Sequence, residues 1–187
     1  MADSFADVTV VIADIVGFAE LTPAKSPERL ALLLDEIFTG FDGLAKEHGL
    51  RKIKTLGNSY MAAGGVPVPS GDHAARAAHM SLDMVDALAR SDERGGHSLQ
   101  VRIGIATGAV VAGVIGRRLY VYDVWGDAVH TASRMESHGV AGRVQVAEST
   151  RRRLGEPFLL EERGTLEVEG QGELKTWFVC GRSGASG

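Results

Sequence analysis

The 187-residue chain has almost no cysteine and no long apolar segment, and each absence restricts what it can be. The single cysteine, Cys180, excludes an intrachain disulfide and fits a reducing compartment. No apolar run approaches the roughly 18 residues of a membrane span, and the polar N-terminus lacks the pattern of a secretory signal. We therefore expect a cytoplasmic chain without a membrane segment. Regulatory domains in a longer parent protein remain compatible with this sequence.

An excess of positive charge is also missing. Lys and Arg number 20 against 24 Asp and Glu, which gives a net charge of -4, whereas nucleic-acid-binding domains usually carry a basic face. The hydrophobic fraction of 44% is ordinary for a globular protein, and the length suits one domain with a substantial core. We predict one domain over residues 1–180, a flexible tail over 181–187, and no nucleic-acid partner.

Hydrophobic periodicity and turn residues predict the order of strands and helices. The expected elements are a strand at 8–12, a helix opened by Ser26-Pro27 and stopped at Gly49, a β-hairpin of 51–55 and 60–63 around Gly57-Asn58, a helix from 72 to about 90, a strand pair of 99–105 and 110–115 around Thr107-Gly108, a helix at 127–137, a strand at 143–146, a short helix at 149–154 and a β-rich end at 158–180. This order predicts an α+β fold with a ferredoxin-like βαββαβ core, C-terminal additions, and helices on one face of a mainly antiparallel sheet.

No single polar residue predicts a chemical function by itself. Asp14 ends a buried strand just before Gly17, where a carboxylate can hold Mg²⁺ or simply cap a turn. Asn58 at the hairpin tip reads first as a turn residue. The Walker A pattern, the GxGxxG pattern and His/Cys zinc spacings are all absent. Function must therefore be sought in ordered sets of motifs.

Four motifs and a C-terminal segment occur in a characteristic order. They are Ala13-Asp14-Ile15-Val16-Gly17-Phe18, Lys52 to Ala62 (KIKTLGNSYMA), Val101 to Gly108 (VRIGIATG), Tyr122 to Met135 (YDVWGDAVHTASRM), and Arg163-Gly164 followed by Glu169 to Thr176 (EGQGELKT). This set resembles the class III adenylyl/guanylyl cyclase family over nearly the whole chain, from about Val8 to Val179.

The resemblance implies a head-to-tail homodimer with active sites at the interface, each built from both chains. It implies ATP as substrate and two divalent cations per site, Mg²⁺ or Mn²⁺, with the ribose 3′-hydroxyl attacking the α-phosphate and pyrophosphate leaving. By position, the resemblance assigns Asp14, the Ile15 backbone and Asn58 to the metals, and the turn of Gly17 and Phe18 to the phosphate-facing loop.

Base selection is assigned to Lys54 and Asp123. Lysine only donates and aspartate only accepts hydrogen bonds, which matches adenine N1 and its 6-amino group, whereas guanine presents the reverse pattern. Arg102 matches a phosphate-binding arginine whose planar fork suits phosphate oxygens. Outside the motif context, all three would be ordinary surface or strand-edge charges.

The helix after Trp125-Gly126 carries Arg134, which matches the transition-state arginine, and His130, one turn earlier on the same face. Three positions depart from the family pattern. Asn58 replaces an aspartate and loses a negative charge, His130 replaces an asparagine, and Glu169 stands where a phosphate-binding lysine is common. These changes predict reduced activity.

Two functions therefore compete. One is a working adenylate cyclase that makes 3′,5′-cyclic AMP, with impaired turnover. The other is a nucleotide-binding or regulatory pseudo-cyclase that acts through homo- or heterodimerisation. A diguanylate-cyclase-like domain fits poorly, because Gly64-Gly65 is followed by Val66-Pro67 and not by acidic residues and phenylalanine.

Overall fold

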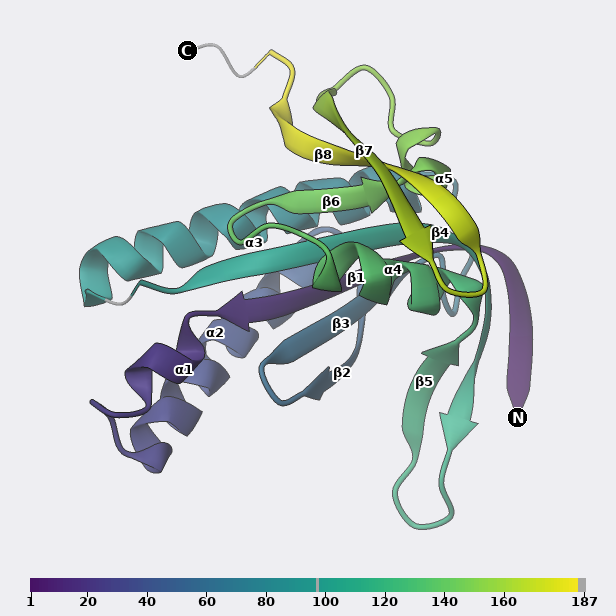
Figure 1. Cartoon of the computed structure of the whole chain (residues 1–187). Coiled ribbons are helices and arrows are strands. Elements are labelled where there is room, and N and C mark those ends of the chain that lie inside the picture. Colours follow the sequence, from purple (N-terminus) through teal and green to yellow (C-terminus); the bar gives the residue numbers. More distant parts are fainter. Residues whose placement is uncertain (97, 185–187) are drawn as a thin grey trace.

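A computed structural model describes residues 1–96 and 98–184. Eight strands form one sheet in the order β2-β3-β1-β4-β6-β8-β7, with β5 paired to β4 outside this path (Figure 1). The elements are β1 (Ala2–Val16), α1 (Phe18–Leu21), α2 (Pro27–Glu47), β2 (Arg51–Leu56), β3 (Ser59–Gly64), α3 (His73–Gly95), β4 (Gln100–Ile115), β5 (Val121–Trp125), α4 (Asp127–Ser137), β6 (Val144–Ala147), α5 (Glu148–Arg151), β7 (Phe158–Val168) and β8 (Gly172–Arg182).

The predicted βαββαβ core is confirmed by the strand order. The core follows the chain order β1, α2, β2, β3, α3 and β4. Its strands lie in the sheet in the order β2-β3-β1-β4, with β1 antiparallel to both β3 and β4. The register places Asp14 opposite Ser59 on one side and Arg102 on the other. Three polar residues from distant parts of the chain thus meet where β1 ends.

Helices cover both faces of the sheet, and the expectation of helices on one face alone is wrong. α2 and α3 pack on the face formed by Val11, Ala13 and Ile15, whereas α4 packs on the opposite face, near Val10 and Met61 (Figure 1). The central strands are therefore buried on both sides and read as continuous apolar runs, which hides the alternation that would distinguish the faces.

β4 is one strand of 16 residues, so the expected strand pair around Thr107-Gly108 is also wrong. Thr107 and Gly108 pair with Thr9 and Val8 of β1, and the pairing continues past a register shift between Phe5 and Val8. Along its end, from Val111 to Ile115, β4 pairs on its other edge with β5, a strand that was not predicted from the sequence. The two strands form an arm that projects from the sheet (Figure 1).

Local end signals explain the elements that the sequence predicted well. Ser26 caps α2, its hydroxyl oxygen accepting a hydrogen bond of 3.4 Å from the Arg29 backbone N–H, and Pro27 occupies the first helical position. Gly49 follows the helix with φ of 70°, a conformation that favours glycine. At the other end of the chain, β8 continues through Arg182, inside the expected tail, and residues 185–187 lie outside the described part.

Among the described residues, no helix combines the length and the apolarity that crossing a membrane requires.

Candidate active site

Asp14 is the centre of a polar cluster at the end of β1. Its Oδ1 accepts a hydrogen bond of 3.0 Å from the Ser59 hydroxyl, and its Oδ2 lies 3.4 Å from a terminal nitrogen of Arg102. The cluster is half-buried, with 19% of the Asp14 side chain exposed. A carboxylate held in this way keeps lone pairs for a cation, and the guanidinium beside it can bind an anionic group.

Asn58 reaches the same place from the β2–β3 hairpin. Its Nδ2 donates a hydrogen bond of 2.8 Å to the Ile15 carbonyl, and the Ile15 N–H donates one of 3.0 Å to the Asn58 carbonyl. Because a carbonyl only accepts, the amide must present its NH₂ group here. Asp14 and the Ile15 carbonyl are the hard oxygen donors that Mg²⁺ or Mn²⁺ prefers, so they fit a first cation. A second cation fits less well, since Asn58 adds no charge and engages the Ile15 carbonyl.

Lys54 and Asp123 come together from β2 and β5. Lys54 Nζ donates a hydrogen bond of 2.9 Å to Asp123 Oδ2, while Asp123 Oδ1 accepts one of 2.8 Å from the Val124 N–H. The lysine side chain is 44% exposed and the aspartate side chain 13%, so the lysine is the partner that solvent reaches. The adjacent hollow of about 290 Å³ is lined by Ile12, Lys54, Leu56, Ser59, Tyr60, Met61, Val129, Ser133 and Glu136.

α4 carries the next two predicted residues. His130 is exposed, and its Nε2 lies 3.4 Å from the Glu169 carbonyl in the turn between β7 and β8. The side chain of Glu169 is exposed at that turn. Arg134 is half-buried, and its guanidinium makes no hydrogen bond or ion pair with another described residue. The arginine is thus available to a ligand or to a second chain.

Gly17 and Phe18 form the turn that leaves β1. Gly17 has φ of 93°, and a Cβ there would lie 2.7 Å from the Ser98 carbonyl oxygen, so only glycine fits. Phe18 begins α1 and packs against the core. The turn therefore fixes the direction of the chain directly after Asp14 and Ile15.

Two further residues of this site, Ser59 and Glu136, were not predicted from the sequence. Glu136 is 8% exposed, and its Oε1 accepts a hydrogen bond of 2.9 Å from Nε of Arg102. Burial raises the pKa of the Glu136 carboxyl, although Arg102 acts in the opposite direction. The spacing along α4 could have indicated Glu136, because Ala128, Ala132 and Glu136 share one helix face. A carboxylate on an apolar face needs a buried partner.

Comparison with known proteins decides the family. Residues 1–181 match the family model described as "Adenylate and Guanylate cyclase catalytic domain". The chain belongs to this family. Its cyclase domain is 45% identical over 186 residues to an adenylate cyclase of Mycobacterium tuberculosis (strain ATCC 25618 / H37Rv), a match that covers 100% of this chain and 42% of the relative.

Guanylyl cyclases are also close relatives of the cyclase domain. The human guanylate cyclase soluble subunit beta-2 is 38% identical over 180 residues, covering 95% of this chain and 29% of that protein. A crystal structure of the catalytic core of a rhodopsin-guanylyl cyclase with converted specificity, in complex with ATPαS, superimposes with a TM-score of 0.91 at 34% identity, covering 97% and 98% of the two chains. The chain spans less than half the length of these two full-length relatives.

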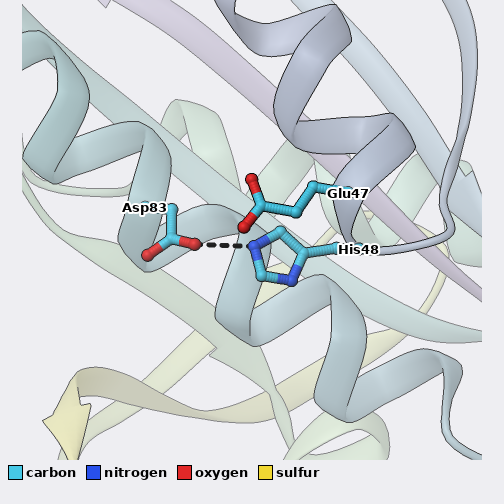
Figure 2. Close-up of side chains that lie close together, drawn as sticks. All are labelled: Glu47, His48 and Asp83. Carbon is cyan, nitrogen blue, oxygen red and sulfur yellow. Dashed lines mark hydrogen bonds and ion pairs between the residues drawn. The ribbon is translucent and has the colours of Figure 1, made fainter.

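A second polar group of the cyclase domain lies between α2, α3 and β8. Glu47 and His48 at the end of α2 face Asp83 of α3, with His48 Nε2 2.6 Å from Asp83 Oδ2 (Figure 2). Arg182 donates to Asp83 Oδ1 at 2.8 Å and to His79 Nδ1 at 2.9 Å. Both oxygens of Asp83 are held by short contacts, at 2.6 and 2.8 Å, whereas the contact of Asp14 with Arg102 is 3.4 Å long. The group therefore fits an ion-pair network that anchors the end of β8 better than a cation site.

We expect this network to be sensitive to pH through His79. Burial lowers the pKa of His79, as do the nearby charges of Arg182 and His48, whereas Asp83 raises it. The unfolded chain therefore binds a proton more readily, so we expect stability to be greatest above the usual histidine pKa of about 6.5 and to fall as the pH decreases below it. His79→Phe keeps a ring beside Phe158 and removes the titration.

The measurement is the melting temperature at several pH values between 7.5 and 5.5. The melting temperature of the unmodified chain should fall further across this range than the melting temperature of His79→Phe. Parallel curves for the two proteins would show that His79 is not responsible.

Proposed function

We propose that this cyclase domain converts ATP to 3′,5′-cyclic AMP and pyrophosphate, as a homodimer, at a rate limited by its metal site. The observation that carries the choice of ATP is the pair of Lys54 and Asp123, 2.9 Å apart. A donor beside an acceptor matches the N1 and 6-amino edge of adenine. A related guanylyl cyclase core with converted specificity holds ATPαS, which supports ATP as a nucleotide that this fold can accept.

The proposed reaction needs little covalent chemistry from the protein. The ribose 3′-oxygen forms a bond to the α-phosphorus, the bond to the pyrophosphate oxygen breaks, and the hydroxyl proton passes to solvent. Arg102 would bind phosphate oxygens, and Arg134 would stabilise charge on the α-phosphate from the partner's side of the site. Divalent cations held by Asp14 and Ile15 supply activation of the attacking oxygen and charge neutralisation when bound.

The proposed dimer follows from where these groups lie. Arg102 and Asp14 form one cluster, whereas Lys54 and Asp123 form another, and Arg134 has its guanidinium free of the other described residues. A two-fold dimer would bring one cluster of each chain to face the other cluster of its partner and so create two equivalent sites. Specific activity should therefore rise with protein concentration.

The first experiment compares cyclic AMP and cyclic GMP formation by the parent chain, with Mn²⁺ and then with Mg²⁺. Cyclic AMP should be the main product. Lys54→Ala removes a charged donor and should lower the ratio of kcat/KM for ATP over GTP by about tenfold. Lys52→Ala is the matched control, because Lys52 lies on the same strand but pairs with Asp42 at 3.0 Å. An equal ratio in the parent and Lys54→Ala would refute the assignment.

The contact of Asn58 with the Ile15 carbonyl favours a second candidate, a nucleotide-binding module without turnover. It predicts binding of ATP in the presence of Mn²⁺ with no product at high protein concentration. Cyclic AMP from the purified parent would exclude it.

A further inference from the structure

The buried carboxylate of Glu136 contacts a residue of the proposed site. Glu136 accepts a hydrogen bond from Nε of Arg102 at 2.9 Å, and 11% of its side chain is exposed. Removing a carboxylate from water is costly, and such groups are retained where a paired charge compensates for the cost. Arg102 supplies that charge here.

Backbone geometry fixes this contact. Gly104 of β4 lies directly beneath α4, and a Cβ there would be 2.1 Å from the Glu136 backbone nitrogen and 2.4 Å from the Ala132 carbonyl oxygen. Only glycine permits this approach. Since Arg102 lies two residues before Gly104, its side chain leaves the same face of the strand, toward α4.

Arg102 is restrained on several sides. Its second ionic contact, to Asp14 Oδ2, is 3.4 Å long, weaker than the 2.9 Å contact to Glu136. Its Cγ lies 3.1 Å from the place that a Cβ of Gly139 would occupy. A cation on Asp14 would compete with the weaker contact, leaving Glu136 as the anchor on this chain. The guanidinium would then keep its terminal N–H groups for another anion.

We propose that Glu136 is a positioning residue, which holds the Arg102 guanidinium in the orientation that binds the nucleotide phosphates. This inference rests on the proposed function, because it requires Arg102 to contact those phosphates. A carboxylate that merely joins α4 to β4 would instead affect folding stability and leave nucleotide binding unchanged. The two roles therefore predict different measurements.

A double-mutant cycle separates the two roles. We would measure the dissociation constant of 3′-deoxy-ATP with Mn²⁺, a nucleotide without the attacking hydroxyl, together with KM and kcat for ATP. Glu136→Ala should weaken 3′-deoxy-ATP binding by about tenfold and raise KM with a smaller change in kcat. Because Glu136 acts through Arg102, the double variant with Arg102→Ala should bind no more weakly than Arg102→Ala alone.

Two further variants keep the test decisive. Glu136→Gln retains the volume and one acceptor oxygen, so it serves if Glu136→Ala does not fold, and it should weaken binding by a smaller factor in the same direction. Glu161→Ala is the matched control, because it breaks another arginine–glutamate pair, that of Arg143 at 3.1 Å, and should leave binding unchanged.

Losses that multiply in the double variant, or Glu136 variants with lower melting temperature and unchanged binding, would overturn the inference. A parent that binds 3′-deoxy-ATP but makes no cyclic nucleotide would refute the proposed function, while the cycle of dissociation constants would still test Glu136. A parent that binds no nucleotide would overturn both.

Discussion

Asn58→Asp is expected to raise the rate of cyclic AMP formation with Mg²⁺ by about 10- to 100-fold. In the parent, the Asn58 amide donates to the Ile15 carbonyl at 2.8 Å and brings no charge. Aspartate cannot donate this hydrogen bond, so the carbonyl is freed, and a second carboxylate joins Asp14. Two carboxylates and a carbonyl form the hard oxygen set that Mg²⁺ prefers.

The measurement is the initial rate of cyclic AMP formation as a function of Mg²⁺ concentration. The midpoint of the metal dependence should move to lower concentration in Asn58→Asp. Asn58→Ala is the matched control, since it also frees the Ile15 carbonyl but adds no charge, and no comparable gain is expected from it. If alanine and aspartate had the same effect, the charge at position 58 would not be the limiting factor.

Negative charges introduced at the tip of the β4–β5 arm should reduce the rate of cyclic AMP formation at least about 100-fold at submicromolar protein concentration. Leu119 and Tyr120 are 83% and 75% exposed at the tip of the arm, beside the exposed side chains of Val114, Ile115 and Val121. An apolar surface of this kind on a projecting hairpin is typical of an interaction site. Aspartate at both tip positions would place two charges in the proposed interface.

Sedimentation velocity and the cyclic AMP rate, measured on the same samples, test this prediction. Leu119→Asp combined with Tyr120→Asp should sediment as a monomer where the parent is a dimer. Leu32→Asp is the control, because Leu32 is 69% exposed on α2, away from the arm. Full activity in a monomeric arm variant would contradict the proposed composite site.

Local signals in the sequence predicted the elements that depend on nearby residues. The cap at Ser26, the turn at Gly57-Asn58 and the helix over 127–137 required only propensity and spacing, and all three occur in the structure. The continuity of β4 could not be predicted in this way. Gly108 reads as a break locally, yet it is held in a strand by pairing with Val8 of β1, a contact between residues 100 positions apart.

In the proposed site, too, some features could be predicted from the sequence and others depend on contacts between distant segments. The resemblance named Asp14, Lys54 and Arg102, and the structure brings Asp14 to Arg102 and Lys54 to Asp123. Their roles remain predictions. What the sequence could not supply was the direction of the Asn58 amide and the contact of Glu136 with Arg102, because both depend on packing between distant segments.

If the exposed Leu119 and Tyr120 at the tip of the arm pair two chains in the proposed homodimer, the abundance of the chain itself sets the rate of cyclic AMP formation. Below the dissociation constant of a homodimer, the amount of dimer follows the square of the total chain by mass action. Doubling expression would then increase cyclic AMP production by about fourfold. A cell could therefore amplify or silence this signal through gene dosage and degradation alone, before any ligand acts on the cyclase domain.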